Sequence, residues 1–536
     1  MLPIASIGVA ALLTALVLPS LLRPPPEQSQ SSAAFSPDAP PDEETQTIIQ
    51  SLRQAASRTA GATGSEDTVP ATTTPTVLAP SRGQCFGDPP RQTESAYSPP
   101  CRPAWSGDNG GATYKNVTGD VVRVAYWHAF GMPSSSERGD ISDVPPPGES
   151  AAHRTARVLQ QYFNDRYELY GRRLQLYAIP QDPATPEEYT ASAVATDEEG
   201  KAFAAIQLET PFCHEFTRRG LICFGGNGYM EKTYLGAAPR WWSYQMGTDK
   251  VDRMTAEYIC KKLAGGTADF AGGNEHGKPR RIAVIAEGYY GNDFRTYDTV
   301  TGPAKEMCGF EPQWATNFDG TDSAQTAAVI AGLRSRDITT VIGSWGLVEG
   351  ITLYSGADAS GYSPEWVLLN SYGLDFNDAA RLLPPNQLQH MFGMSGWELP
   401  RPAPDQDCYR AYKSVDPAGE PDGDFCRLLY IQIEHVVNGI QEARPNLTDE
   451  TFARGMWSMP LEEPRTPWAI GGGYSPSDFS FVDDLAEIWW SPSCVDPEGG
   501  EPGCWMHTAN GRRWRPGELD TEIRVFRDGV AGHTPA

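Results

Sequence analysis

Apolar runs of strand length alternate with amphipathic segments of helical period along most of this chain. Residues 281–286 (RIAVIA) are rich in β-branched side chains and are followed directly by the turn-forming sequence EGYYGND, which predicts a buried strand ending in a tight loop. Before this strand, apolar residues recur at helical spacing between a capping Thr-Asp pair at 248–249 and a terminating Gly-Gly pair at 265–266. Helix, strand and loop therefore form an α/β unit, and strands of an open α/β sheet deliver such loops to a ligand crevice.

The same alternation occurs on both sides of this unit. Further strands are predicted at residues 121–127, 172–179, 202–208, 221–224, 338–343 and 365–370. Helices are predicted at residues 155–163, 213–219, 326–333 and 429–440, and weaker patterns indicate a helix at 451–456 and a strand at 485–490. Repeated strand-helix alternation is typical of an α/β fold.

This order of segments resembles the type I periplasmic binding proteins, the branched-chain amino-acid (Leu/Ile/Val) solute-binding family of ABC transporters. The resemblance runs from about Val121 to Gly439, and Asn164-Asp165 and Gly171-Arg172 match the turn of the family's β-α-β start. It implies two Rossmann-like lobes joined by a hinge, with crossovers near residues 248 and 388. The expected boundaries are 85–248 for lobe 1, 249–387 for lobe 2, 388–458 for the return to lobe 1, and 459–536 for a C-terminal extension packing on lobe 2.

The resemblance also implies that the ligand binds to loops at the strand ends of both lobes. The expected ligand-binding residues are His128, Glu209, Thr210 and Asn227 in lobe 1, and Tyr290, Trp345 and Tyr372 in lobe 2. Family members that bind amino acids hold the ammonium group with a carboxylate from a lobe 2 loop. The matching loop here reads Asn370-Ser371-Tyr372 and has no acid, so the aromatic residues favour a planar, aromatic or apolar organic solute. For each aromatic residue the alternative is core or hinge packing.

The ten cysteines favour disulfide bonds over a metal site. They contain no CxxC motif and no histidine at zinc-finger spacing. Successive pairing predicts Cys85–Cys101, Cys213–Cys223, Cys260–Cys308, Cys408–Cys426 and Cys494–Cys504. Such bridges belong to an oxidising compartment; buried, unpaired cysteines are the alternative. We expect no metal and no cofactor.

The first 84 residues differ in composition from the rest of the chain. Residues 2–22 carry no charge and are long enough to cross a bilayer, so residues 1–23 are either a signal peptide or an N-terminal membrane anchor. Residues 24–84 are rich in Pro, Ser and Thr, which predicts a disordered linker because little apolar surface is available for burial. These features predict an extracytoplasmic protein, secreted or anchored to the cell membrane.

Charge and missing motifs exclude several functions. The formal net charge of -25 over 536 residues argues against nucleic acid as a partner, and the absence of GxxxxGK[ST] excludes the transporter's ATPase subunit. Ser344 stands in a strand-loop context like that of a nucleophile, but Ile342 occupies the position where the motif requires glycine. His435 lies off the apolar face of its predicted helix, and His214 has no HExxH-type spacing, so we expect both to be solvated or locally hydrogen-bonded. The sequence therefore predicts a protein that is not an enzyme.

Together with the resemblance, these observations predict a solute-binding protein that captures a small organic molecule for an ABC-type importer, with the permease as partner. A ligand-sensing or scaffold protein of the same fold without transport is the first alternative. An extracytoplasmic hydrolase is the second, and it requires a convergent nucleophile and base that the sequence does not offer.

Overall fold

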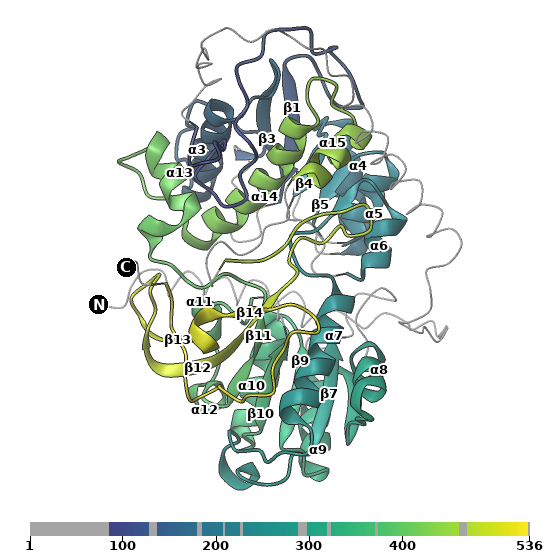
Figure 1. Ribbon diagram of the computed structural model, residues 1–536, viewed down its shortest axis with the longest axis vertical. Helices are drawn as coiled ribbons and strands as arrows, with labels where there is room; N and C mark the ends of the chain where they lie inside the picture. Colours follow the sequence, from purple (N-terminus) through teal and green to yellow (C-terminus); the bar gives the residue numbers. More distant parts are fainter. Residues whose placement is uncertain are drawn as a thin grey trace, which may run out of the picture.

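Two α/β lobes are stacked along the long axis of the molecule (Figure 1). This computed structural model describes residues 85–127, 137–179, 185–206, 210–225, 229–287, 297–318, 323–369, 373–459 and 469–533. We call the part built on the first sheet lobe 1 and the part built on the second sheet lobe 2. The mixed α/β architecture predicted from the sequence is confirmed.

Lobe 1 contains a six-stranded sheet in the order β2-β3-β1-β4-β5-β6. Only the short β2 runs antiparallel; the other neighbours pair in parallel. The strands are β1 (Val121–Tyr126), β2 (Gly139–Asp140), β3 (Arg173–Ala178), β4 (Ala204–Ile206), β5 (Ile222–Phe224) and β6 (Trp241–Trp242). The helices are α3 (Ala151–Arg166), α4 (Pro186–Glu198), α5 (Thr210–Arg218), α6 (Glu231–Gly236), α13 (Asp407–Val415), α14 (Gly423–Glu442) and α15 (Asp449–Ser458).

Lobe 2 contains an eight-stranded sheet in the order β13-β12-β11-β10-β9-β7-β8, with β14 also paired to β12. The strands are β7 (Ile282–Glu287), β8 (Trp314–Phe318), β9 (Thr340–Ser344), β10 (Glu365–Leu369), β11 (Met391–Ser395), β12 (Leu485–Val495), β13 (Pro502–His507) and β14 (Arg513–Trp514). Strands β7 to β11 are parallel, and β12 adds antiparallel to β11. The C-terminal part of the chain therefore extends the sheet of lobe 2.

Helices cover the sheet of lobe 2, and the first of them changes from α-helical to π-helical hydrogen bonding near its end. Helix α7 (Thr248–Tyr258) continues as a π-helical turn at Ile259–Leu263. The other helices are α8 (Tyr297–Cys308), α9 (Ser323–Ser335), α10 (Leu347–Ala359), α11 (Asn377–Ala380), α12 (Pro385–Leu388) and α16 (Thr508–Gly511), with 3-10 turns at Gly273–Glu275 and Ala403–Asp405.

Within the described residues the chain crosses between the lobes at three places, which together form a hinge. The first crossing, residues 243–247, joins β6 to α7, and the second, residues 396–406, joins β11 to α13. The third leads into β12 after Ser480, which pairs with Ser243 of the first crossing. Arg513 links the other two: its guanidinium donates to the carbonyl oxygens of Gly396 and Trp397 and, through Nε, to Asp484 Oδ1 at 2.6 Å.

The return to lobe 1 begins later in the chain than the expected residue 388. Strand β11 pairs with β10, with Trp366 opposite Met391, so it lies in the sheet of lobe 2. Helix α12 and β11 thus form one more α/β unit of lobe 2 before the second crossing. Local sequence does not show which sheet receives these residues, because strand pairing depends on residues far away in the chain.

All five predicted disulfide pairings are confirmed. The longest in sequence, Cys260–Cys308, joins the π-helical turn to the end of α8 with the two Cα atoms 5.9 Å apart. Among the described residues, no helix combines the length and the apolar character that a membrane span requires. The expected signal or anchor (residues 1–23) and the expected linker (residues 24–84) lie outside the described residues.

Candidate functional site

The two sheets present the C-terminal ends of their parallel strands to each other across the hinge. The first crossing leaves lobe 1 from the C-terminal end of β6, and the second leaves lobe 2 from the C-terminal end of β11. Because parallel strands end at one edge of a sheet, the loops after β1, β4 and β5 share that edge in lobe 1, and those after β7, β9 and β10 share it in lobe 2. Ligands of open α/β folds bind at this edge.

Most of the predicted ligand-binding residues follow these strands directly in the chain. His128, Glu209, Asn227, Tyr290 and Tyr372 lie outside the described residues. Thr210 begins α5, but its side chain is also outside the description. For all of them, contact with a ligand stays a prediction that rests on their position at the strand ends.

Trp345 is the predicted ligand-binding residue whose side chain is described. Its exposed fraction is 0%, and it belongs to the hydrophobic core of lobe 2. Its indole Nε1 donates a hydrogen bond of 3.1 Å to the hydroxyl of Tyr354. The ring thus packs in the core under the loop that follows β9. Direct stacking of this ring on a solute stays a prediction.

Asp375 is a polar residue at this edge that the sequence analysis missed. It lies in the loop after β10 with an exposed fraction of 8%, and its Oδ2 accepts a 2.6 Å hydrogen bond from Ser395 Oγ at the end of β11. Its Oδ1 has no hydrogen-bond partner in the described structure. Burial raises the pKa of Asp375 to about 7, although the hydrogen bond from Ser395 opposes the shift. The local signal was available: an acid follows Gly373-Leu374 three residues after Tyr372.

Next to Asp375, aromatic rings and a guanidinium join the two lobes. Phe376 of lobe 2 and Trp397 of the second crossing lie with their ring centroids 4.7 Å apart. Arg427 of α14 places its guanidinium carbon 4.7 Å from the centroid of Phe376 and 5.9 Å from that of Trp397. Its Nη1 lies 3.3 Å from Glu498 Oε1 in the loop between β12 and β13. This cluster holds the lobes together beside the hinge.

A small cavity lies behind this cluster. Its lining includes Tyr97, Tyr244, Trp397 and Arg427, and its volume is about 30 Å³. A buried water needs roughly 10 to 15 Å³ of such space. As described, the cavity therefore has room for about two waters.

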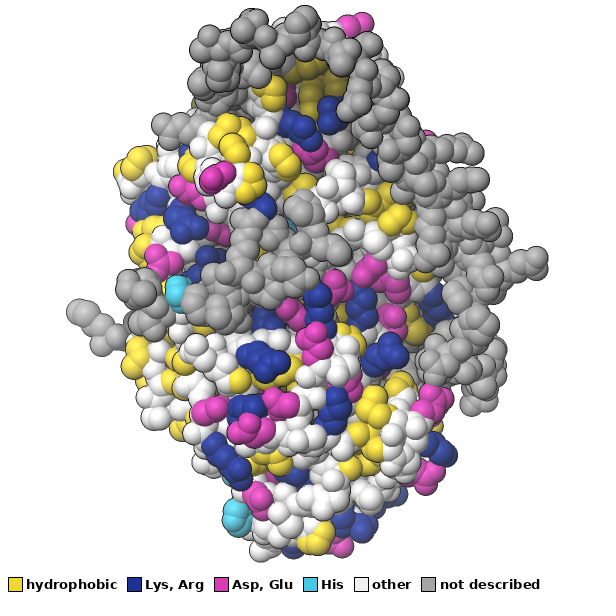
Figure 2. Space-filling view, in the orientation of Figure 1, with side chains coloured by type: hydrophobic (Ala, Val, Ile, Leu, Met, Phe, Trp, Pro, Cys, Tyr) yellow, Lys and Arg dark blue, Asp and Glu magenta, His cyan; other side chains and the backbone are white. Residues whose placement is uncertain are grey.

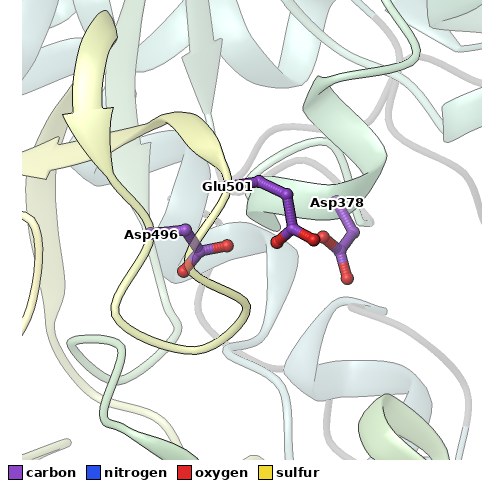
Figure 3. A group of neighbouring side chains, drawn as sticks. All are labelled: Asp378, Asp496 and Glu501. Atoms are coloured by element: carbon purple, nitrogen blue, oxygen red, sulfur yellow. The ribbon is translucent and has the colours of Figure 1, made fainter. Parts of the chain in front are cut away.

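Three neighbouring carboxylates in lobe 2 form a candidate metal site. Figure 3 shows Asp378, Asp496 and Glu501 as neighbours. Their ligand oxygens lie within 4.8 Å of one another. However, the guanidinium of Arg381 donates to both Asp378 and Asp496, and the Asn377 amide donates to Asp496 at 3.0 Å. One cation of the chain thus already pairs with two of the three carboxylates, and this pairing competes with a metal ion for their oxygens.

The charged surface shows no large basic field on the face that we can describe. In Figure 2, Lys and Arg side chains alternate with Asp and Glu over the lower half of the molecule, which is lobe 2. Nucleic-acid binding relies on clustered positive charge. The surface charge on this face therefore does not favour such a partner.

Comparisons with known proteins identify the fold. No protein-family model matches the chain, and no curated protein matches its sequence. Many solved structures match its three-dimensional structure, and they include type I periplasmic binding proteins. The chain therefore has the fold of type I periplasmic binding proteins, at a sequence identity that shows the fold alone.

Three of these structures illustrate the range. A possible leucine/isoleucine/valine-binding protein from Rhodopirellula baltica SH 1 is 12% identical with a TM-score of 0.51, over 72% of this chain and 96% of that one. An R. palustris ABC transporter solute-binding protein in complex with 4-hydroxybenzoate is 9% identical with a TM-score of 0.51, over 74% and 97%. A fatty acid ABC transporter substrate-binding protein from Thermomonospora curvata is 14% identical with a TM-score of 0.50, over 79% and 100%.

Proposed function

We propose that this chain is an extracytoplasmic solute-binding protein that captures a small organic molecule for an ABC-type importer. The observation that carries the proposal is the pair of parallel sheets whose C-terminal edges face each other across a hinge of three crossing segments. Two lobes joined in this way open and close around a solute by rotation at the hinge. The type I periplasmic binding protein fold supports the same role, by analogy.

The ligand that we propose is a planar, aromatic or apolar organic solute. The candidate rings are Tyr290, Trp345 and Tyr372, and the candidate polar contacts are His128, Glu209, Thr210 and Asn227. We assign Asp375 a positioning role, because its hydrogen bond to Ser395 holds the loop after β10 against the end of β11. One structural neighbour is a complex with 4-hydroxybenzoate, which is a planar aromatic solute.

The proposed setting follows from the disulfides and the N-terminal sequence. Five disulfides fit an oxidising compartment outside the cytoplasm. We propose that residues 1–23 act as a signal peptide or membrane anchor, that residues 24–84 tether the folded body, and that an ABC permease is the partner. The domain division we propose is the expected one, with lobe 2 extended to include β11. We propose no catalytic activity.

The test is identification of the solute, followed by calorimetry. Small molecules that co-purify with the exported protein are identified by mass spectrometry, and the best candidate is titrated into wild type and a Tyr290→Ala variant. Loss of a stacking ring should weaken binding by about 1 to 3 kcal/mol, while thermal unfolding of the unliganded protein stays the same. Unchanged affinity would remove Tyr290 from the site.

Two other outcomes separate the alternatives. Turnover of the solute by the wild-type protein would replace the binding role with an enzymatic one. A reconstituted permease and ATPase are added to the solute-loaded protein. If they do not change solute binding or lobe closure, and the protein does not stimulate them, a sensor or scaffold is favoured over a transport protein.

A further inference from the structure

His435 of α14 is buried among aromatic rings on the lobe 1 side of the hinge. Its exposed fraction is 3%, and its hydrogen-bond partner Tyr474 lies far away in the sequence, so the expectation of a solvated or locally hydrogen-bonded histidine is wrong. The ring centroids around it lie between 4.5 and 5.8 Å away, and they belong to Tyr97, Phe224, Tyr244, Tyr474 and Phe481. The sequence pattern failed here because the third crossing segment covers a second face of α14.

One nitrogen of this imidazole is anchored and the other is not. The Tyr474 hydroxyl lies 3.3 Å from His435 Nδ1 and 3.2 Å from the carbonyl oxygen of Ser243. Since the carbonyl only accepts, the hydroxyl can donate to it and accept from Nδ1, which leaves the lone pair on Nε2. Nε2 is buried without a hydrogen-bond partner in the described structure. A ring held through one nitrogen with a free lone pair on the other is the arrangement of metal-binding histidines.

Two thioethers share the cavity into which His435 faces. The cavity has a volume of about 20 Å³, and its lining includes His435, Met456 and Met459. Met456 and Met459 are three residues apart, at the end of α15 and its C-cap. A Cβ placed on Gly439 would lie 2.8 Å from Met456 Sδ, and Gly439 is one helical turn after His435 on the same face of α14. The packing of α14 on α15 therefore places the sulfur of Met456 against α14, one helical turn from His435.

A water molecule does not fit this cavity well, although the volume would admit one. A buried water needs two to four polar partners. The amide of Asn438 is already engaged with the Tyr167 hydroxyl and the Tyr97 carbonyl, and the Tyr474 hydroxyl makes the two contacts given above. The Tyr97 hydroxyl is engaged with Glu398. The remaining lining residues are Met456, Met459, Gly473 and Phe481. Nε2 alone would remain to hold a water.

We propose that His435 Nε2 and the thioether sulfurs of Met456 and Met459 bind one soft monovalent cation, Cu(I). Thioether and imidazole ligands select Cu(I), whereas harder divalent ions require carboxylate or water oxygens. No carboxylate lines this cavity in the described structure.

The test is a Cu(I) competition titration on the full chain. Cu(I) is supplied anaerobically as its acetonitrile complex, and bicinchoninate reports the free ion by its colour. All ten cysteines are in disulfides, so no thiol competes for the ion. Wild type should withdraw one equivalent. His435→Phe and Met456→Leu should each weaken binding by more than about 100-fold, because each removes a direct ligand and even indirect partners cost 10- to 100-fold.

Controls separate a lost ligand from a lost fold. Met391→Leu alters a buried methionine of the lobe 2 sheet and should bind Cu(I) like wild type. Thermal unfolding of each metal-free variant reports the fold, and His435→Phe keeps a ring in the aromatic cage. X-ray absorption at the copper edge should show two sulfur neighbours and one nitrogen neighbour. The proposal is overturned if wild type withdraws no Cu(I), or if the His435→Phe/Met456→Leu double variant withdraws it equally well.

Discussion

Helix α14 and the sheet of lobe 2 bury carboxylates in different ways. Glu434 of α14 accepts hydrogen bonds from the hydroxyls of Ser95, Thr93 and Tyr430, all of them neutral. Glu365 of β10 instead faces Arg280, whose Nε and Nη2 donate to its two oxygens at 2.8 and 3.0 Å. Both carboxylates have an exposed fraction of 0%. Burial of equal depth is therefore accommodated by neutral partners in one region and by an ion pair in the other.

The two kinds of partner, neutral hydroxyls and a cation, have different consequences for stability. Burial raises the pKa of Glu434 to about 8, so this carboxyl enters the fold protonated at neutral pH. The Arg280–Glu365 pair is held as two charges, and a second such pair, Lys262 with Glu487 at 2.9 Å, anchors α7 and its π-helical turn to β12. A buried pair is costly to break because the remaining charge has no solvent. We therefore expect the lobe 2 sheet to be sensitive to mutation and α14 to be sensitive to pH.

The largest effect is expected from Arg280→Ala. It leaves Glu365 buried with only Thr340 Oγ1 and the backbone N–H of Phe270 as donors. Breaking a buried pair from one side costs about 3 to 5 kcal/mol, measured as the free energy of unfolding by chemical denaturation. Arg123→Ala is the control, because its partner Asp140 is exposed and such pairs contribute about 0 to 1 kcal/mol. Equal losses in the two variants would contradict the comparison.

A pH-dependent effect is expected from Glu434→Gln. The pKa of Glu434 is about 8 in the folded state and about 4.3 when unfolded. The folded state therefore binds the extra proton between these values, and wild-type stability falls as pH rises from about 4 to about 8, with a slope of up to about 1.4 kcal/mol per pH unit. Glutamine keeps the neutral state at every pH. The free energy of unfolding, measured by denaturation from pH 5 to pH 8, should rise in the variant relative to wild type as pH rises. If the two free energies change with pH in the same way, Glu434 is already charged in the folded protein.

The smallest effect on stability is expected from Arg427→Gln. This residue lies nearer the surface of α14, the helix that also carries the buried Glu434. Its guanidinium lies over Phe376 and Trp397 and beside Glu498, in a partly exposed position. A cation–π contact of this kind contributes about 0.5 to 1 kcal/mol. We expect that loss of unfolding free energy at pH 7, with a wider inter-lobe angle by small-angle X-ray scattering. A loss of unfolding free energy as large as that of Arg280→Ala would mean that Arg427 is shielded from solvent as fully as the buried ion pair.

Much of the architecture could be predicted from the sequence. Seven predicted strands coincide with β1, β3, β4, β5, β7, β9 and β10, and the helix predicted around Leu429 and Ile440 lies inside α14. The predicted cysteine pairs also hold, because each joins neighbours in sequence. These features depend on local hydrophobic period and short loops, which the chain itself displays.

Other elements were missed because their sequences lack a clear period. The strand β8 reads Trp-Ala-Thr-Asn-Phe, and it lies at the edge of the sheet with largely exposed or half-buried residues. The two-residue β6 is too short for any alternation. The importance of Asp375 was also missed, since an acid three residues beyond a predicted loop looks like an ordinary solvated carboxylate until Ser395 is placed beside it.

The sequence by itself determined that this is a disulfide-bonded α/β protein, and it predicted ligand-binding loops after the parallel strands. Only the tertiary structure decided which sheet receives β11, how Arg513 ties two crossing segments together, and that His435 lies in a dry aromatic cage with Met456 nearby. The physical reason is the distance along the chain over which each interaction acts. Hydrophobic period and chain stiffness act over a few residues, whereas the burial and partners of a polar group are set by segments far away in the sequence.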